Sequence, residues 1–156
     1  MVELDETDKK IIQHVCEGTY SHSELAKLAG VSRNTVYRRL DKLEEEGVLK
    51  KRVMAIPNFE KIGFSSIIIG INVGIGDLEK TIRFLKKLGQ VKFLWKTYGE
   101  YELVAVLMCD ERNVGTCINN LKESLQDLNV EISEFVAAPS ISWEKVEFAP
   151  FDIESE

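Results

Sequence analysis

Residues 30–47 constrain the fold of this 156-residue chain more than any other segment. Their apolar side chains, Val36, Leu40 and Leu43, follow the i, i+4, i+7 spacing of a helix that buries one face. Ser32 stands where it can cap the start of this helix, and a glycine stands at each end of the segment, where a turn needs one. The spacing therefore predicts a helix with one buried face and one polar face.

Two shorter helices are predicted before this one. Apolar residues recur at helical spacing over residues 7–17, and Asp5 and Asp8 lie near the start of that segment, where free N–H groups favour carboxylates. Ser21 and Glu24 have the spacing of a capping box, which predicts a short second helix. Two short helices joined by a glycine-containing turn form a helix-turn-helix, whose second helix reads the major groove of DNA.

The polar face of the third predicted helix carries the side chains that DNA recognition needs. With the apolar stripe pointing inward and about 100° per residue, Asn34 and Arg38 point most directly outward. Asparagine pairs with adenine and arginine with guanine, while hydroxyls, further arginines and helix N-terminal amides suit phosphate. The basic triplet at 50–52 is interpreted as a phosphate contact or, alternatively, as a solubilising edge strand. The predicted DNA-binding residues are Ser32, Arg33, Asn34, Thr35, Tyr37, Arg38, Arg39, Lys50 and Lys51.

The charge of the chain is unevenly distributed. The net charge is −6, yet residues 1–59 carry 10 basic and 10 acidic side chains, so all of the excess lies in the remaining residues. This asymmetry predicts two domains, and it excludes a protein that holds nucleic acid by an overall basic field. Seven basic residues fall within residues 33–52, so any DNA binding is predicted to be local. A solvated helix face is the alternative interpretation of this cluster.

The second half of the chain has the pattern of a β-α-β-β-α-β domain. Strands are predicted over residues 65–73, 91–97, 101–109 and 130–136, and helices between residues 77 and 89 and over 110–128. A turn at 98–100 joins two of the strands in a hairpin. This order is that of a ferredoxin-like fold, whose sheet carries both helices on one face and commonly dimerises through the other. The predicted fold class is therefore α+β, with a winged-helix-like helix-turn-helix domain followed by a ferredoxin-like βαββαβ oligomerisation domain.

These patterns divide the chain into four parts. The predicted boundaries are residues 1–52 for DNA binding, 53–62 for a strand and linker, 63–138 for the ferredoxin-like domain and 139–156 for a tail that can add an edge strand. No secretory signal is present and the longest apolar run is far too short to span a bilayer, so a cytoplasmic protein without a membrane partner is expected. Cys16, Cys109 and Cys117 match neither a redox CxxC pair nor a zinc framework, so reduced thiols are expected.

Motifs in both predicted domains follow the pattern of one known family. They are Leu4-Asp5 with Asp8, Glu24-Leu25-Ala26, Ser32-x-x-x-Val36-x-x-Arg39-Leu40-x-x-Leu43-Glu44-x-x-Gly47-Val48-Leu49, and Gly99-x-Tyr101-Glu102. Through these motifs the chain resembles the Lrp/AsnC family of transcription regulators, also called feast/famine regulatory proteins. The resemblance covers nearly the whole chain. Glu102 stands where this family usually has aspartate.

The resemblance implies a regulator that binds a pseudo-palindromic operator in double-stranded DNA as a homodimer, often assembled into an octamer. It also implies a small effector, often an amino acid, whose ammonium needs an acceptor and whose carboxylate needs donors. No catalytic residue, metal ligand or cofactor is expected. The alternative is that the second-domain motif is only a hairpin, in which Gly99 has a positive φ and Tyr101 packs. The predicted effector-binding residues are Tyr98, Gly99, Glu100, Tyr101 and Glu102.

Two other functions compete with this interpretation. An architectural DNA-binding protein is compatible with the same fold, but a net charge of −6 opposes wrapping over a large area. Siroheme-decarboxylase-like enzymes resemble this architecture as well. The only histidines, His14 and His22, lie in the helix-turn-helix segment, which argues against a tetrapyrrole site in the second domain.

Overall fold

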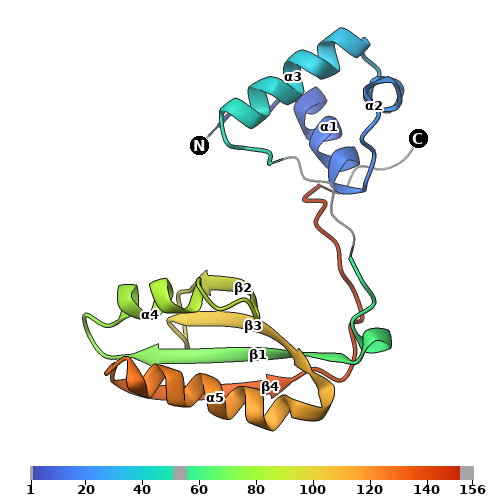
Figure 1. Ribbon diagram of the computed structural model, residues 1–156. Coiled ribbons are helices and arrows are strands. Elements are labelled where there is room, and N and C mark those ends of the chain that lie inside the picture. The colour runs from blue at the N-terminus through green and yellow to red at the C-terminus, as the bar shows by residue number, and fades with distance from the viewer. Residues whose placement is uncertain (1, 51–55, 152–156) are drawn as a thin grey trace. The chain divides into compact units, whose positions relative to one another are not determined.

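The computed structural model describes residues 2–50 and 56–151 (Figure 1). The chain divides into two compact units. The first comprises Met1–Ala55 with Glu144–Glu156, and the second comprises Ile56–Trp143. The strand predicted over 53–56 falls almost entirely on residues 51–55, which lie outside the described residues, as do Lys51 and Arg52.

The first unit contains the three predicted helices, α1 (Glu6–Cys16), α2 (His22–Ala29) and α3 (Arg33–Glu45). At the start of α1, Asp8 N donates to Asp5 Oδ1 at 2.9 Å and Asp5 N donates to Asp8 Oδ2 at 3.2 Å, which makes a reciprocal capping box. The apolar stripes of the three helices meet in one core, so the helical periodicity of the sequence is confirmed. That core consists of Ile11, Val15, Leu25, Ala26, Ala29, Val36 and Leu40.

The turn between α2 and α3 is formed by Gly30. This residue has a left-handed conformation with φ 68°, and Val31 N donates to Ala26 O at 3.0 Å, which closes the end of α2. The capping box predicted at Ser21 is wrong, because the Ser21 side chain makes no capping hydrogen bond. The helix nevertheless begins at His22, since burial of Leu25 and its neighbours against the other two helices holds it in place.

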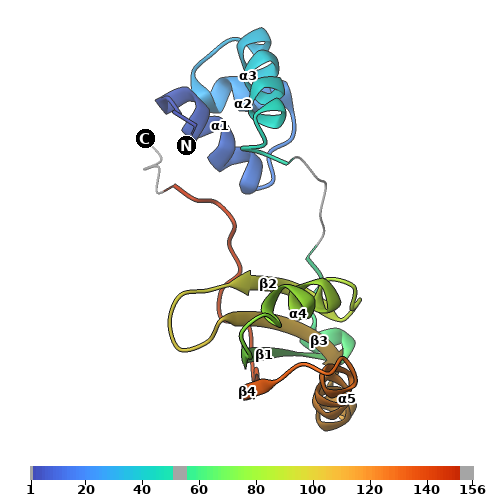
Figure 2. The ribbon, with the colours of Figure 1, turned by 90° about the vertical axis from the view of Figure 1, so that its left-hand side faces the viewer.

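The second unit is a four-stranded antiparallel sheet with the order β2-β3-β1-β4, as Figure 1 shows. Its helices pack their apolar sides against one face of the sheet (Figure 2), where they share a single core with the inward side chains of β1 and β3. The elements are η1 (Glu60–Ile62), β1 (Phe64–Val73), α4 (Leu78–Leu85), β2 (Val91–Lys96), β3 (Leu103–Asp110), η2 (Glu111–Asn113), α5 (Val114–Asp127) and β4 (Ile132–Pro139). The predicted β-α-β-β-α-β order is confirmed.

Several boundaries differ from the predicted ones because side chains make contacts far away in the sequence. Asp77 does not cap α4; its Oδ2 instead accepts from Glu131 N at 2.9 Å and so ties the start of α4 to the start of β4. The helix predicted from residue 110 begins only at Val114, because Asp110 Oδ1 accepts from Arg112 N and favours the 3-10 turn η2. Helix α4 ends at Leu85, before the predicted glycine.

The face of the sheet opposite the helices carries an apolar surface, which we call the open face. The strand register forms two rows that cross all four strands on this face. In the order β2, β3, β1 and β4, the first row is Phe93, Val106, Ile68 and Ala138, and the second is Trp95, Val104, Gly70 and Val136. Ile68 and Trp95 are each about half exposed, at 49% and 48%. The rings of Phe93 and Trp95 stack with their centroids 5.5 Å apart. The surface is therefore apolar along both rows, except that the ring of Tyr101 covers Gly70, and exposed apolar surfaces of this kind are often covered by a partner.

The C-terminal tail contacts the second unit and then joins the first. Trp143 Nε1 donates to Ser66 Oγ at 2.9 Å, and the Trp143 ring lies 5.2 Å from that of Phe59. Further along, Phe151 N donates to Gln13 Oε1 at 2.9 Å within the first unit. Residues 140–151 form no strand, so the predicted edge strand is wrong for this described part of the tail.

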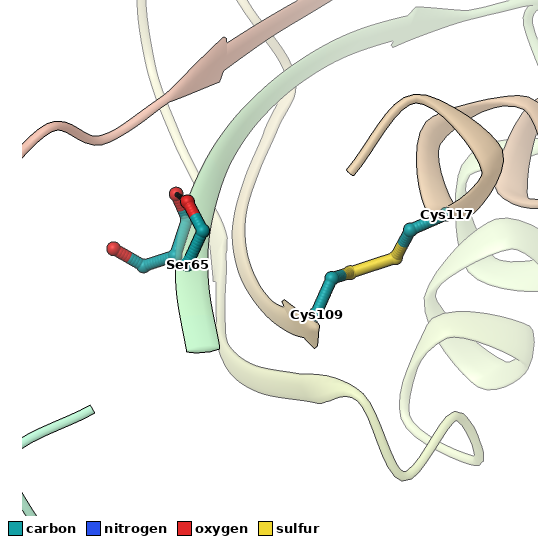
Figure 3. Close-up of a disulfide and its surroundings, with 4 residues drawn as sticks. Ser65, Cys109 and Cys117 are labelled. Atoms are coloured by element: carbon teal, nitrogen blue, oxygen red, sulfur yellow. Dashed lines mark hydrogen bonds between the residues drawn. A yellow bond between two sulfur atoms is a disulfide. The ribbon is translucent and has the colours of Figure 1, made fainter. Parts of the chain in front are cut away.

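The cysteines correct another prediction. Cys109 and Cys117 are joined by a disulfide between the end of β3 and the first turns of α5, with Cα atoms 6.4 Å apart (Figure 3). Cys16 carries a free thiol, and burial raises the pKa of that thiol. The sequence alone did not select a pair among three cysteines, because the pairing depends on how α5 folds back beside β3. Within the described residues, no helix has the length and apolar character that crossing a membrane requires.

Candidate nucleic-acid interface

Helix α3 presents one buried and one exposed face, as its spacing predicts. Val36, Leu40 and Leu43 are at most 2% exposed and hold the helix against α1 and α2. On the opposite side, Asn34 and Arg38 are exposed and, four residues apart, project side by side. An amide and a guanidinium on one protruding helix face can form bidentate hydrogen bonds with base edges in a major groove.

The N-terminus of α3 is suited to a phosphate group. Ser32 Oγ accepts from Thr35 N at 3.1 Å and lies 2.8 Å from Thr35 Oγ1, so these two hydroxyls close the first turn. The first turn contains no acidic residue, and Arg33 is exposed there. The helix dipole and the arginine therefore produce a positive field at this end of the helix. Lys50 is also exposed beyond the end of α3.

Tyr37 links the exposed face of α3 to α2. Its side chain is 57% exposed, and its ring meets that of His22 edge to face, with centroids 5.9 Å apart and an interplanar angle of 79°. This contact orients the ring while leaving most of it accessible to a partner.

Arg39 makes ion pairs that the sequence did not predict. Its Nη1 lies 2.6 Å from Asp5 Oδ2 and 3.1 Å from Asp8 Oδ1, so the guanidinium is turned toward the start of α1. The backbone N–H of Asp8, with Arg39 beside it, lowers the pKa of the Asp5 carboxyl below its ordinary value. The structure thus makes Arg39 a link between α1 and α3, while its contact with phosphate stays a prediction.

Replacing Arg39 by alanine is expected to destabilise the first unit without altering base preference. Asp8 is only 4% exposed, and a buried carboxylate left without its partner costs about 1 to 3 kcal/mol of unfolding free energy. Because the folded pKa of Asp5 is lowered, its contribution to wild-type stability is present above about pH 4 and is lost as the pH falls through that lowered pKa. Urea unfolding at pH 7 and at pH 3 measures both effects. A stability difference between the two proteins that is unchanged at pH 3 contradicts this assignment.

The predicted effector-binding residues lie in the β2–β3 connection, residues 97–102. Gly99 has φ 140°, and the Tyr98 side chain is fully exposed. Asn72, on β1, holds this connection: its Nδ2 donates to Glu100 O at 2.7 Å, and its Oδ1 accepts from Glu102 N at 2.8 Å. The sequence did not identify Asn72, although an asparagine inside an apolar strand is unusual enough to have indicated a specific partner.

The remaining residues of this connection are also engaged. Glu102 Oε2 accepts from Val73 N at 2.9 Å, so the glutamate that replaces the usual aspartate binds the neighbouring strand. The ring of Tyr101 covers Gly70, where an added Cβ would lie 2.7 Å from Tyr101 Cγ. Both features of the hairpin interpretation, the positive φ and the packed tyrosine, are thus present. The connection is a hydrogen-bonded turn with an exposed tip.

Comparisons with known proteins agree with this geometry. Residues 4–50 match the family described as "Winged helix-turn-helix DNA-binding". The HTH-type transcriptional regulator FL11 of Pyrococcus horikoshii is 34% identical over 105 residues, which cover 66% of this chain and 69% of that protein. The structure of AsnC from E. coli has a TM-score of 0.76 at 21% identity and covers 94% of this chain and 98% of the other.

A further solved structure contains a bound amino acid. The transcriptional regulator NMB0573 of Neisseria meningitidis, in its L-Met complex, has a TM-score of 0.78 at 19% identity, covering 94% of this chain and 96% of the other. At such identities the two solved structures show a shared fold. Together with the family match at the helix-turn-helix and the identity to FL11, they confirm the resemblance stated above. This chain belongs to the Lrp/AsnC family of transcriptional regulators.

Proposed function

We propose that this regulator binds pseudo-palindromic operators as a dimer, reads bases with the exposed face of α3, and responds to a small amino-acid effector. The observation that carries the proposal is the exposed face of α3, with Asn34 and Arg38 side by side above a fully buried apolar stripe. In this proposal both side chains contact base edges, while Arg33, Lys50 and the N-terminal amides of α3 contact phosphates. Such a regulator works in the cytoplasm, where the DNA is.

The open face supports the dimer. A helix-turn-helix reads a half-site of only a few base pairs, and a symmetric dimer doubles this to a pseudo-palindrome. The apolar rows through Ile68 and Trp95 are exposed in a single chain, and a sheet face of this kind is stabilised when a second copy covers it. Assembly of dimers into octamers belongs to the same proposal.

The β2–β3 connection supports an effector site. Asn72, Glu100 and Glu102 place amide and carboxylate groups around a turn whose backbone is held in position, and carboxylates accept hydrogen bonds from an ammonium. The L-Met complex of NMB0573 shows that a regulator of this fold binds an amino acid. We propose that the exposed tip at Tyr98 and Gly99 takes part in contacts between dimers and that an amino acid bound there changes the assembly.

Selection of bound sequences from randomised DNA tests the function directly. The protein is incubated at one stated salt concentration, in parallel with and without a mixture of the twenty amino acids. Enrichment of a pseudo-palindrome is the expected result. Binding without enrichment identifies an architectural protein instead, and the absence of binding contradicts the proposal.

The effector site is tested by two substitutions in the β2–β3 connection. Glu102→Ala removes the carboxylate, and Gly99→Asp places a side chain at φ 140°, which is strained for any residue except glycine. Both proteins are expected to lose amino-acid-dependent changes in assembly, measured by sedimentation velocity with each amino acid. Gly89→Ala, where an added Cβ meets nothing within 4 Å, is the control. An unchanged response in both variants contradicts the assignment of this site.

A further inference from the structure

The disulfide between Cys109 and Cys117 closes a short loop at one corner of the second unit. Cys109 lies near the end of β3 and is only 6% exposed, whereas Cys117 lies in the first turns of α5 and is partly exposed. The residues between them form η2 and the start of α5. Their Cα separation of 6.4 Å is within the range that a disulfide spans.

This loop contacts the segment that enters β1 and lines a hollow together with the C-terminal tail. Glu111 N donates to Gly63 O at 3.0 Å, which attaches the loop to the segment that enters β1. Trp143 N donates to Glu60 Oε1 at 3.0 Å, which attaches the tail to the same place. A hollow of about 200 Å³ lies among these three segments, and Glu60, Glu111 and Trp143 are among the residues that line it.

We propose that Cys109 and Cys117 form a reversible redox switch, closed by a low-molecular-weight disulfide such as oxidised glutathione and opened by the corresponding thiol. The bond joins two elements already held together by the core, where Leu107 of β3 and Leu121 of α5 pack in one cluster. This packing joins β3 and α5 independently of the cross-link, as a disulfide that opens and closes requires. In mesophilic cells, disulfides of proteins kept among reducing thiols are usually transient, catalytic or redox-sensing.

The bond forms by two successive thiol–disulfide exchanges, which together transfer two electrons from the protein to glutathione disulfide. The more accessible Cys117 thiolate attacks one sulfur of glutathione disulfide, which forms a mixed disulfide and releases one glutathione thiolate. The Cys109 thiolate then attacks the Cys117 sulfur and releases the second. In total, the two protein thiols lose two protons and two electrons, and one glutathione disulfide becomes two glutathione thiols. Reduction follows the reverse path.

Opening or closing the Cys109–Cys117 bond changes the conformational freedom of the loop between the two cysteines. The closed bond restricts residues 110–116, including the Glu111 contact to Gly63, and opening it restores conformational freedom to the loop. Glu60, at the entry to β1, and the tail segment 140–143 line one hollow together with this loop, so in this proposal the state of the bond alters how those two segments are held. The regulatory effect, a DNA affinity that depends on the thiol state, rests on the proposed function above.

Thiol trapping tests the switch itself. The full-length protein is equilibrated with mixtures from fully reduced to fully oxidised glutathione, quenched in acid, alkylated and weighed by mass spectrometry. Cys109 and Cys117 are expected to lose and gain alkylation together across this range, with the same midpoint in wild type and in Cys16→Ser. A bond that stays closed in the most reducing mixture is a permanent cross-link and overturns the proposal, and so does one that never closes.

Two further measurements separate the switch from the proposed function. In hydrogen exchange, residues 60–63 and 110–117 are expected to exchange about tenfold faster in the reduced form. The Cys109→Ser/Cys117→Ser protein is expected to behave like reduced wild type in either mixture. For a selected DNA sequence, the two forms are expected to differ in affinity by about fivefold or more. If the oxidised and reduced forms bind this DNA with equal affinity, the proposed regulatory effect is wrong, although the disulfide can still be reversible. If neither form binds DNA, the proposed function fails, while thiol trapping still decides the switch.

Discussion

An Ile68→Glu protein is expected to be monomeric and to bind its operator about a hundredfold more weakly, or worse, than wild type. Ile68 lies in the middle of the open face, between Val106 and Ala138 on the neighbouring strands, and is 49% exposed in a single chain. In a symmetric dimer through this face, one substitution places two carboxylates in the same apolar interface. Because the cross-strand neighbours of both are apolar, both carboxylates remain unfavourably buried.

The loss of DNA affinity follows from the loss of the dimer. When two helix-turn-helix units are linked, the second half-site binds at a high effective concentration, and this gain disappears in a monomer. Sedimentation equilibrium measures the mass, and fluorescence anisotropy with a labelled operator measures the affinity, both at one salt concentration. These two quantities are expected to change together over a range of protein concentrations.

Ile75→Glu is the matched control. Ile75 is fully exposed in the connection between β1 and α4, outside the open face, so the same substitution there adds the same charge without touching the interface. Circular dichroism of both proteins shows whether the fold is kept. If Ile68→Glu has the mass of wild type while remaining folded, the dimer forms elsewhere and the open face is not its interface.

The parts of the fold that the sequence predicted are those governed by local periodicity. The spacing of Val36, Leu40 and Leu43 depends only on one helix, and the apolar run in β1 depends only on one strand, so both could be identified from the sequence. The carboxylates predicted at the start of the first helix, Asp5 and Asp8, likewise lie within one turn. The order of these elements then restricted the second unit to a ferredoxin-like topology.

The parts that were not predicted depend on contacts across the sequence. Arg39 has the position of a phosphate contact on α3, yet its partner Asp8 is 31 residues away. Asp77 has the position of a helix cap, yet it binds Glu131, 54 residues away. A polar side chain can bind a partner on its own helix or one on another element, and tertiary packing decides which of the two lies closer. The sequence pattern of a single element therefore does not predict the partner. The cysteines differ, because Cys109 and Cys117 are only eight residues apart and the expectation of reduced thiols came from the absence of a known spacing motif.

Arg38→Ala and Asn34→Ala are each expected to weaken operator binding by about 1 to 3 kcal/mol and to relax preference at one base position in each half-site. Both side chains lie on the exposed face of α3 and can reach base edges. A selection from randomised DNA with each variant measures the preference, and anisotropy titrations against the selected and a scrambled sequence measure the affinity.

Lys50→Ala and Arg33→Ala are expected to behave differently, because a phosphate contact carries no sequence information. Each is expected to weaken binding to both sequences about equally and to reduce the dependence of log affinity on log salt concentration by about one, since one phosphate fewer is neutralised. Lys87→Ala removes an exposed positive charge from the second unit and serves as the control for net charge alone. It is expected to leave both the preference and the salt dependence nearly unchanged.

Comparison with Arg39→Ala separates base reading from helix stability. Arg39 binds Asp5 and Asp8, so its loss lowers the stability of the unit and reduces binding to every sequence while leaving preference intact. Arg38, one residue earlier, is exposed and lies on the outward face of α3. If Arg38→Ala and Asn34→Ala also weaken all sequences uniformly, then α3 positions the protein through phosphates alone, and its exposed face does not read bases.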